Sequence, residues 1–108
     1  AKQLKKNVAA PNTLSKEEQR KRAAEQRKLT APIRRDIEDT EKALAKLDKQ
    51  LAELEVQLAD TELYEDNRKA DLLKLLDEQA SKQQQHSDYE EHLLLAMTSL
   101  EDMEAQFT

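Results

Sequence analysis

The chain has 108 residues, of which 38% are charged and only 3% aromatic, and it contains no glycine, no cysteine and two prolines. This composition excludes a globular core of ordinary thickness, a disulfide framework, a thiolate zinc site and a glycine-rich phosphate loop. The longest apolar run, residues 93–97, is too short to span a membrane, and no signal-peptide pattern opens the chain. We therefore expect a cytoplasmic protein.

The net charge of −5 conceals a division between the two parts of the chain. Residues 1–35 carry eleven Lys or Arg against three Glu, a balance of +8, whereas residues 36–108 carry 7 basic and 20 acidic residues, a balance of −13. Such asymmetry indicates that the N-terminal part faces a polyanion and the remainder faces solvent or a basic partner.

The N-terminal segment predicts a linker followed by a helix. Residues 1–14 include a Pro-Asn-Thr run and lack a clear helical period, so we expect a flexible linker there and a single hairpin domain over 15–108. Ser15, followed three residues later by Glu18, forms a capping box that begins the helical pattern.

Pro32 interrupts this helical pattern. It removes one backbone donor, so it either kinks a continuous helix near residues 28–31 or ends one helix and starts another, with Thr30 as the cap of the restart. We expect a basic helix at about 15–30, a bend, and a main helix at about 32–59.

Apolar residues then recur at alternating steps of four and three, the spacing of a coiled-coil stripe. The first stripe comprises Ile33, Ile37, Thr40, Leu44, Leu47, Leu51, Leu54 and Leu58. The second comprises Leu72, Leu75, Gln79, Lys82, His86, Tyr89, Leu93, Ala96, Leu100, Met103 and Phe107. Pairing residue i with residue 130 minus i matches every layer. The sequence therefore predicts an all-α fold, an antiparallel two-helix coiled-coil hairpin with a basic N-terminal helical extension, a connection at about 59–66 and a second helix at about 67–106.

The predicted connection has no glycine for a tight left-handed turn. We expect Leu63 and Tyr64 to pack over the end of the seam, and Asp60 and then Asp66 or Asn67 to cap the turns. Its acidic residues complement a helix dipole rather than bind calcium, because the glycine and spaced ligands of an EF-hand loop are missing.

Residues with possible chemistry are few. His86 and His92 are six apart, which is not the spacing that presents two imidazoles to one metal on a helix. His86 lies on the stripe opposite Leu44, where it is expected to loosen the middle of the rod together with Lys82 and Gln79. No catalytic triad, carboxylate pair or phosphate loop can be assembled, so we expect neither catalysis nor a catalytic residue, cofactor or metal in this chain.

The basic N-terminal helix is the best candidate site. The predicted register leaves residues 16–22 projecting beyond the second helix, whereas Arg27 and Lys28 lie across from acidic residues at 101–104 that partly neutralise them. No aromatic residue that could stack on bases lies in this region, so we expect contacts to a nucleic-acid backbone without sequence readout. The candidate contact residues are Arg20, Lys21, Arg22, Arg27, Lys28, Arg34 and Arg35.

Several of these features resemble a known family. The basic run at Lys21–Arg27, the in-helix Pro32 followed by Ile-Arg, the leucine heptads, and the Leu-Ala-Asp-Thr-Glu-Leu-Tyr-Glu segment at 58–65 are similar to the C-terminal extension of ATP-binding cassette F-family (ABC-F) ATPases. The similarity is greatest to the YheS-like branch of Gram-negative bacteria, and the Uup C-terminal domain is related. It covers roughly residues 15–80.

The resemblance implies an antiparallel coiled coil that follows the second nucleotide-binding domain of the parent and contacts ribosomal RNA, or DNA in the Uup-like relatives. It places ATP and Mg²⁺ in the parent protein, whose ATPase motifs would lie upstream. The implied partners are the ribosome or DNA and the nucleotide-binding domains of the parent chain. We also expect no membrane contact and a monomer or weak dimer. The alternative from the residues alone is a structural coiled coil that spaces or docks protein domains, or dimerises through exposed leucines.

Overall fold

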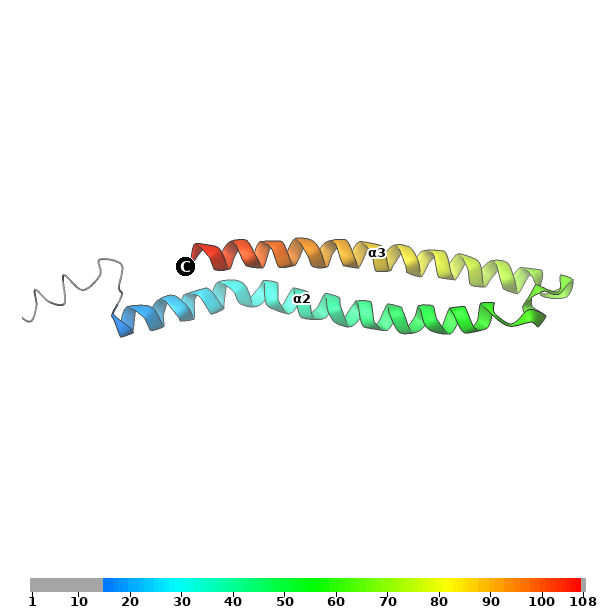
Figure 1. The fold of residues 1–108 in the computed structure, drawn as a ribbon, viewed down its shortest axis with the longest axis horizontal. Coiled ribbons are helices and arrows are strands. Elements are labelled where there is room, and N and C mark those ends of the chain that lie inside the picture. Colours follow the sequence, from blue (N-terminus) through cyan, green and yellow to red (C-terminus); the bar gives the residue numbers. More distant parts are fainter. Residues whose placement is uncertain (1–14, 108) are drawn as a thin grey trace, which may run out of the picture.

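The computed structural model describes residues 15–107, so the predicted linker at 1–14 and Thr108 lie outside the described residues. The two long helices run side by side in opposite directions as an extended hairpin (Figure 1), and no strand occurs within the described range. The all-α helical hairpin is confirmed. Its elements are α2 (Lys16–Leu58), the 3₁₀ turns η1 (Thr61–Tyr64) and η2 (Asp66–Arg68), and α3 (Lys69–Gln106).

The first helix is continuous through its proline. α2 has 43 residues, about 65 Å at the helical rise, and contains Pro32. Its axis changes direction in the cyan part near residue 30 (Figure 1), as the kinked alternative requires. The Ser15 hydroxyl accepts a hydrogen bond from the Glu18 N–H at 3.1 Å, which confirms the predicted N-cap.

Thr30 does not cap a second helix, so that expectation was wrong. Its hydroxyl donates instead to the Gln26 carbonyl at 2.8 Å, one helical turn back, and its side chain is fully buried. Because the helix does not restart at Pro32, no free first-turn amide needs a cap, and the hydroxyl satisfies itself within the turn. Thr40, also buried, bonds to the Asp36 carbonyl in the same way.

The interface between α2 and α3 follows the predicted stripes. Every residue of the first stripe is buried or half-buried, and Leu47 and Leu54 are the most enclosed of its leucines. On α3 the stripe residues are likewise buried or half-buried, except Tyr89, which is 40% exposed. Two helices bury one stripe between them and nothing more, so most stripe residues keep one edge in water.

Polar contacts across the interface report the register. They join Asp36 with His92, Asp48 with His86, Gln50 with Lys82 and Arg34 with Glu104, so the paired residue numbers sum to between 128 and 138. Side chains on a helix lean toward its N-terminus, and in an antiparallel pair two long side chains therefore meet when their numbers sum to more than the backbone register. Three of the four sums exceed 130, as this lean requires, and the sum of Asp36 and His92 falls two below it. The contacts therefore lie around a backbone register near the predicted 130.

The connection closes the far end of the rod. Leu63 is only 2% exposed, and Asp60 accepts from the Glu62 N–H at 3.1 Å, both as predicted. The Tyr64 ring is exposed, but its hydroxyl donates to the Leu58 carbonyl at 2.7 Å and so covers the end of α2. The start of α3 has no side-chain cap, contrary to the expectation for Asp66 or Asn67, because η2 runs directly into the helix.

Candidate nucleic-acid interface

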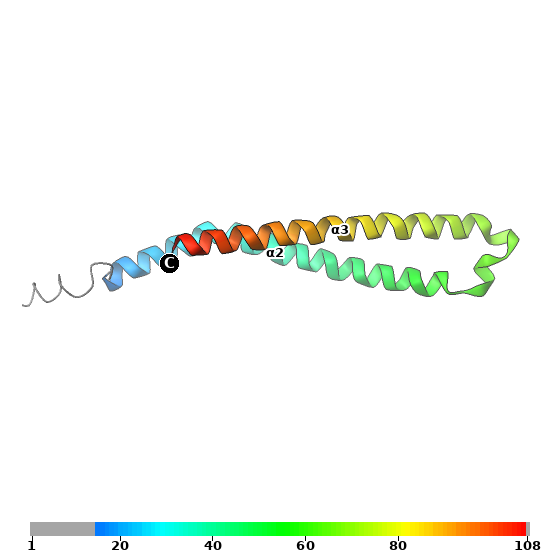
Figure 2. The same cartoon turned by 45° about the horizontal axis from the view of Figure 1, so that its top comes forward.

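The site lies at the open end of the hairpin, where α2 begins. Figures 1 and 2 both show the first turns of α2 extending past the C-terminal end of α3. Residues 15–22 are all exposed, and half-burial begins at Ala23. Because α3 is absent beside this overhang, none of its acidic side chains faces the first basic residues of α2.

The seven predicted contact residues differ in how they are paired. Lys21 forms an ion pair of 3.8 Å with Glu17, but both side chains are more than three-quarters exposed, and such pairs contribute little. Five of the seven make no hydrogen bond or ion pair through their side chains within the described part of the chain, so their charges are available: Arg20, Arg22, Arg27, Lys28 and Arg35.

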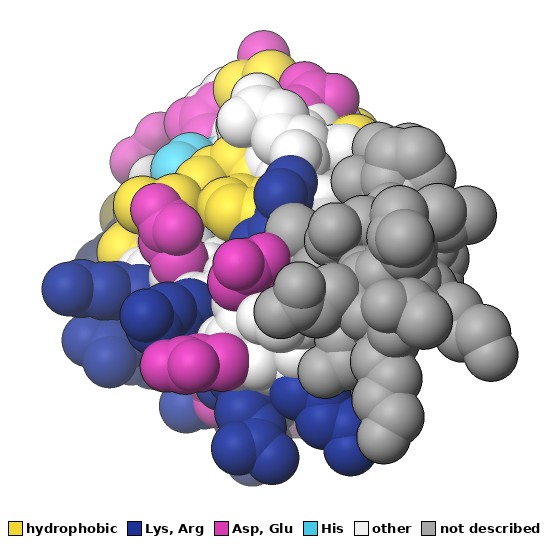
Figure 3. Space-filling model, turned by 90° about the vertical axis from the view of Figure 1, so that its left-hand side faces the viewer, with side chains coloured by type: hydrophobic (Ala, Val, Ile, Leu, Met, Phe, Trp, Pro, Cys, Tyr) yellow, Lys and Arg dark blue, Asp and Glu magenta, His cyan; other side chains and the backbone are white. Residues whose placement is uncertain are grey.

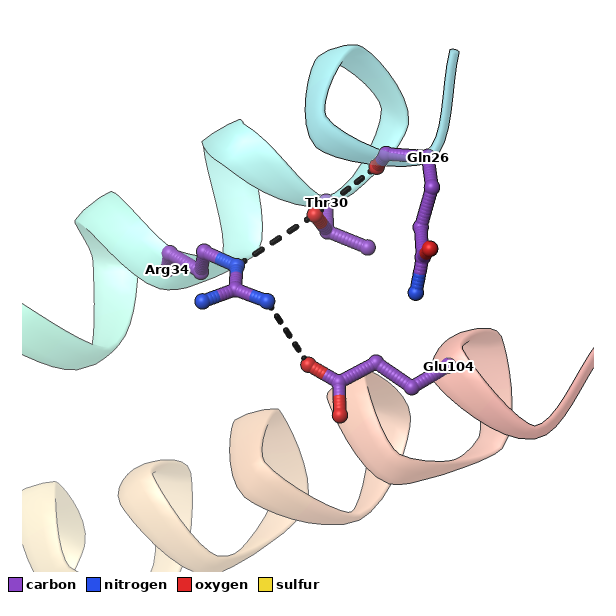
Figure 4. A network of polar contacts seen from close by, with 4 residues as sticks. All are labelled: Gln26, Thr30, Arg34 and Glu104. Carbon is purple, nitrogen blue, oxygen red and sulfur yellow. Dashed lines mark hydrogen bonds and ion pairs between the residues drawn. The ribbon is translucent and has the colours of Figure 1, made fainter. Parts of the chain in front are cut away.

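Arg34 is held in a network instead of facing a ligand (Figure 4). Its Nη2 donates to Glu104 Oε1 at 2.8 Å, and its Nε donates to the Thr30 hydroxyl at 3.3 Å. Thr30 in turn donates to the Gln26 carbonyl. The guanidinium therefore joins α2 to α3, and we regard Arg34 as a positioning residue that fixes the open end.

Arg27 and Lys28 form no ion pair with α3 within residues 15–107. Of the three carboxylates expected to lie across from them, Glu101 and Asp102 form no ion pair within these residues, and Glu104 pairs with Arg34 instead. Because Arg34 and Glu104 both lean toward their own N-termini, they meet about one turn away from the positions that a backbone register would pair. The prediction from residue numbers alone missed this displacement.

The two helices divide the charge at this end. Figure 3 looks at the open end and shows Lys and Arg side chains gathered along the lower and lower-left part of the molecule, on the α2 side, with apolar and acidic side chains above them. From Lys16 to Arg35, α2 carries eight basic and three acidic residues, whereas α3 carries three Lys and nine Asp or Glu. A polyanion therefore encounters a favourable surface on α2 and an unfavourable one on α3.

The middle of the rod holds a polar set that the sequence reasoning undervalued. His86 lies between two carboxylates, with Nε2 2.7 Å from Asp48 and Nδ1 2.7 Å from Glu90. Desolvation lowers the pKa of His86, but the hydrogen bonds and charges of Asp48 and Glu90 outweigh it, so the pKa is raised above 6.5. Lys82 donates to Gln50 at 3.1 Å. His86 and Lys82 therefore hydrogen-bond across the helices, which the sequence analysis did not predict.

A shallow groove lies nearer the open end, where the small residues Thr40 and Ala43 face Tyr89. Asp36, which binds His92 at 2.7 Å, also lines the groove, and its acidic character does not suit a polyanion. Among residues 15–107, no group of three or more His, Asp or Glu side chains is arranged to hold a metal ion. Neither helix in the described range is long and apolar enough to cross a membrane.

Comparison of the chain with protein-family models, with curated proteins and with solved structures finds no match in any of the three. The fold itself defines the class of protein, which is an extended antiparallel helical hairpin with a basic overhang.

Proposed function

We propose that this chain is a non-catalytic, cytoplasmic accessory domain that contacts a nucleic-acid backbone through its basic open end. We further propose that it is the C-terminal coiled-coil domain of a YheS-like ABC-F ATPase, in which it assists a ribosome-directed or translation-related activity. ATP and Mg²⁺ would then act in the parent chain, and the hairpin would be a monomer or weak dimer.

The observation that carries this proposal is the set of unpaired cations on the exposed start of α2. Arg20 and Arg22 lie on the overhang, and Arg27, Lys28 and Arg35 continue the basic surface where α3 runs alongside. Each phosphate neutralised by such a cation releases condensed counterions, so five contacts to a duplex give a log–log salt slope of about −4 to −5. Backbone contacts alone recognise RNA and DNA alike, and the two targets proposed here, ribosomal RNA or DNA, are those that the family resemblance implies.

The test is fluorescence anisotropy of a labelled RNA hairpin and a labelled DNA duplex, titrated with the chain across a salt series. The variant Arg20→Glu/Lys21→Glu/Arg22→Glu should lose binding. Its matched control is Arg68→Glu/Lys69→Glu/Lys74→Glu, which makes the same change in net charge at the opposite end of the rod. The control should retain most of the affinity.

Absence of wild-type binding to both probes at low salt would refute autonomous nucleic-acid contact. Equal loss in the two variants would refute the location, since net charge alone would then explain the effect. The ratio of RNA to DNA affinity identifies the preferred target.

A structural role is the second candidate, and one observation favours it. Leu94 and Leu95 are 66% and 63% exposed on α3, away from the seam. A hairpin that spaces or docks protein domains, or dimerises, would use such a face. Sedimentation of the wild type and of Leu94→Ser/Leu95→Ser would then show self-association that is insensitive to salt and is lost only in the leucine variant.

A further inference from the structure

A second basic feature of α2 extends well beyond the open end. Basic residues recur at intervals of seven over five successive heptads, and all five are exposed. We name this series the cation ladder: Lys21, Lys28, Arg35, Lys42 and Lys49. No other heptad position of α2 has the same charge sign throughout this stretch.

The ladder occupies the face of α2 opposite α3. Lys42 and Lys49 each follow a buried seam residue, Thr40 or Leu47, by two positions, which is about 200° around the helix. Residues seven apart lie nearly in line along a helix, so the other three cations continue the same face. The ladder is therefore the ridge of the rod that points furthest from the partner helix.

The cations of the ladder are weakly paired or unpaired. Lys28, Arg35 and Lys49 form no side-chain hydrogen bond or ion pair within residues 15–107. Lys21 and Lys42 take part only in ion pairs one turn long, at 3.8 and 3.7 Å, between side chains that are 69–81% exposed. Pairs of this kind exchange readily for a stronger anion.

From these observations we propose that a nucleic-acid duplex lies lengthwise along the cation ladder, so that its phosphate backbone is contacted as far as Lys49. The inference rests on the proposed function and adds the path of the ligand. Twenty-eight residues separate the first rung from the last, about 42 Å at the helical rise, with about 10.5 Å between rungs. The evenly spaced cations follow the length of α2, including its bend near residue 30, and such a series suits a long polymer of regularly repeated phosphates.

The remaining side chains of this face favour a nucleic acid over a membrane surface. Small exposed residues, Ala24, Ala31 and Ala45, stand between the rungs, and from Lys21 to Lys49 no large apolar or aromatic side chain lies in line with them. Val56, which is 74% exposed, lies in line only one heptad beyond the last rung. Three carboxylates, Glu38, Asp39 and Glu53, lie one turn from the last two rungs. Glu17, Glu18 and Glu25 stand one turn from Lys21 in the same way. Carboxylates therefore weaken both ends of the ladder, and they do not set the last two rungs apart from the first three.

The first test removes only the last two rungs. Lys42→Gln/Lys49→Gln should reduce the salt slope for a DNA duplex by about one to two, because up to two phosphate contacts are lost. Lys69→Gln/Lys74→Gln makes the same change in net charge on α3, whose face is not part of the ladder. The control should keep the wild-type slope, and circular dichroism should show equal helicity in all three proteins.

The second test maps the path directly. Because the chain has no cysteine, a single cysteine can replace Lys28, Lys49 or Lys74 and be labelled with a photoactivatable cross-linker. Each of the three variants loses one lysine, so they differ only in the position of the label. Lengthwise binding predicts cross-links to the duplex from positions 28 and 49 and none from position 74.

The outcomes separate the two proposals. Loss of slope in the ladder variant together with cross-linking from position 49 supports lengthwise binding. Wild-type binding with an unchanged slope in that variant and cross-links from position 28 alone would overturn the ladder and leave the basic end as the site. Failure of the wild type to bind any duplex would overturn both.

Discussion

Replacement of Leu63 by alanine should destabilise the whole hairpin, because this side chain closes the connected end. It comes from η1, which packs against both α2 and α3, and is only 2% exposed. Removing it loses nearly the full transfer free energy of the deleted methyl groups, about 2 kcal/mol, and leaves a cavity that adds to the loss. We expect a decrease of about 3 kcal/mol in the free energy of unfolding, in line with such truncations elsewhere.

Urea denaturation followed by the helical circular dichroism signal measures this change as a lower midpoint at constant slope. For a domain of this size, about 3 kcal/mol corresponds to a melting temperature about 12–24 °C lower. The control is Leu73→Ala, the same chemical change at a side chain that is 58% exposed. It should change stability by less than about 0.5 kcal/mol. Equal effects of the two substitutions would refute the assignment of Leu63 as the closing residue.

Three other changes test the seam and the bend of α2. His86→Gln should remove a pH-dependent part of stability. Because the pKa of His86 is raised in the folded state, its stabilisation is fully present below pH 6.5 and is lost as pH rises through the folded-state pKa. The melting temperature of the wild type, but not that of the variant, should therefore fall across this pH range. A wild-type profile that is flat or rises would contradict this. Pro32→Ala restores a backbone donor inside α2 and should raise the free energy of unfolding by about 1–2 kcal/mol in the same denaturation assay; a decrease would mean that the open end depends on the bend. Gln79→Leu, at a half-buried seam position, should stabilise by about 1 kcal/mol, and thermal melts that show no gain would indicate that the amide is already well accommodated.

Much of the fold could be predicted because the apolar residues that define it recur periodically in the sequence. A seven-residue repeat of apolar side chains, together with one constant residue sum, determines which faces meet and in which direction, and the buried Leu47 and Leu54 lie where that repeat places them. The continuity of α2 through Pro32 could not be predicted in this way. A proline removes a single hydrogen bond, and the packing of the neighbouring turns decides whether the helix survives.

The candidate site was predicted less completely, because charge pairing depends on side-chain direction and not only on backbone position. The basic cluster follows from composition, but the partner of each charge depends on side-chain direction over about one helical turn. Glu104 therefore meets Arg34 and leaves Arg27 unpaired, and His86 reaches Asp48 although the backbone register pairs it with Leu44. A constant sum of paired residue numbers specifies which backbone positions lie opposite each other. Long side chains lean toward the N-terminus of their own helix, so their charged ends meet partners other than those the sum predicts.

The distribution of stability along the rod bears on how the basic surface works. The best-buried leucines, Leu47, Leu54 and Leu63, all belong to the half near the connection. The other half is joined by smaller buried residues, Thr30 and Ala96 among them, and it borders the groove. The five unpaired cations between Arg20 and Arg35 therefore stand on the half with the smaller apolar contribution, where local opening requires the least free energy. A polyanion bound only by the folded form would stabilise that half in particular, so ligand binding and closure of the open end are thermodynamically coupled. Arg34 links the two, because it belongs to the basic surface by charge and to the interhelical contact by geometry.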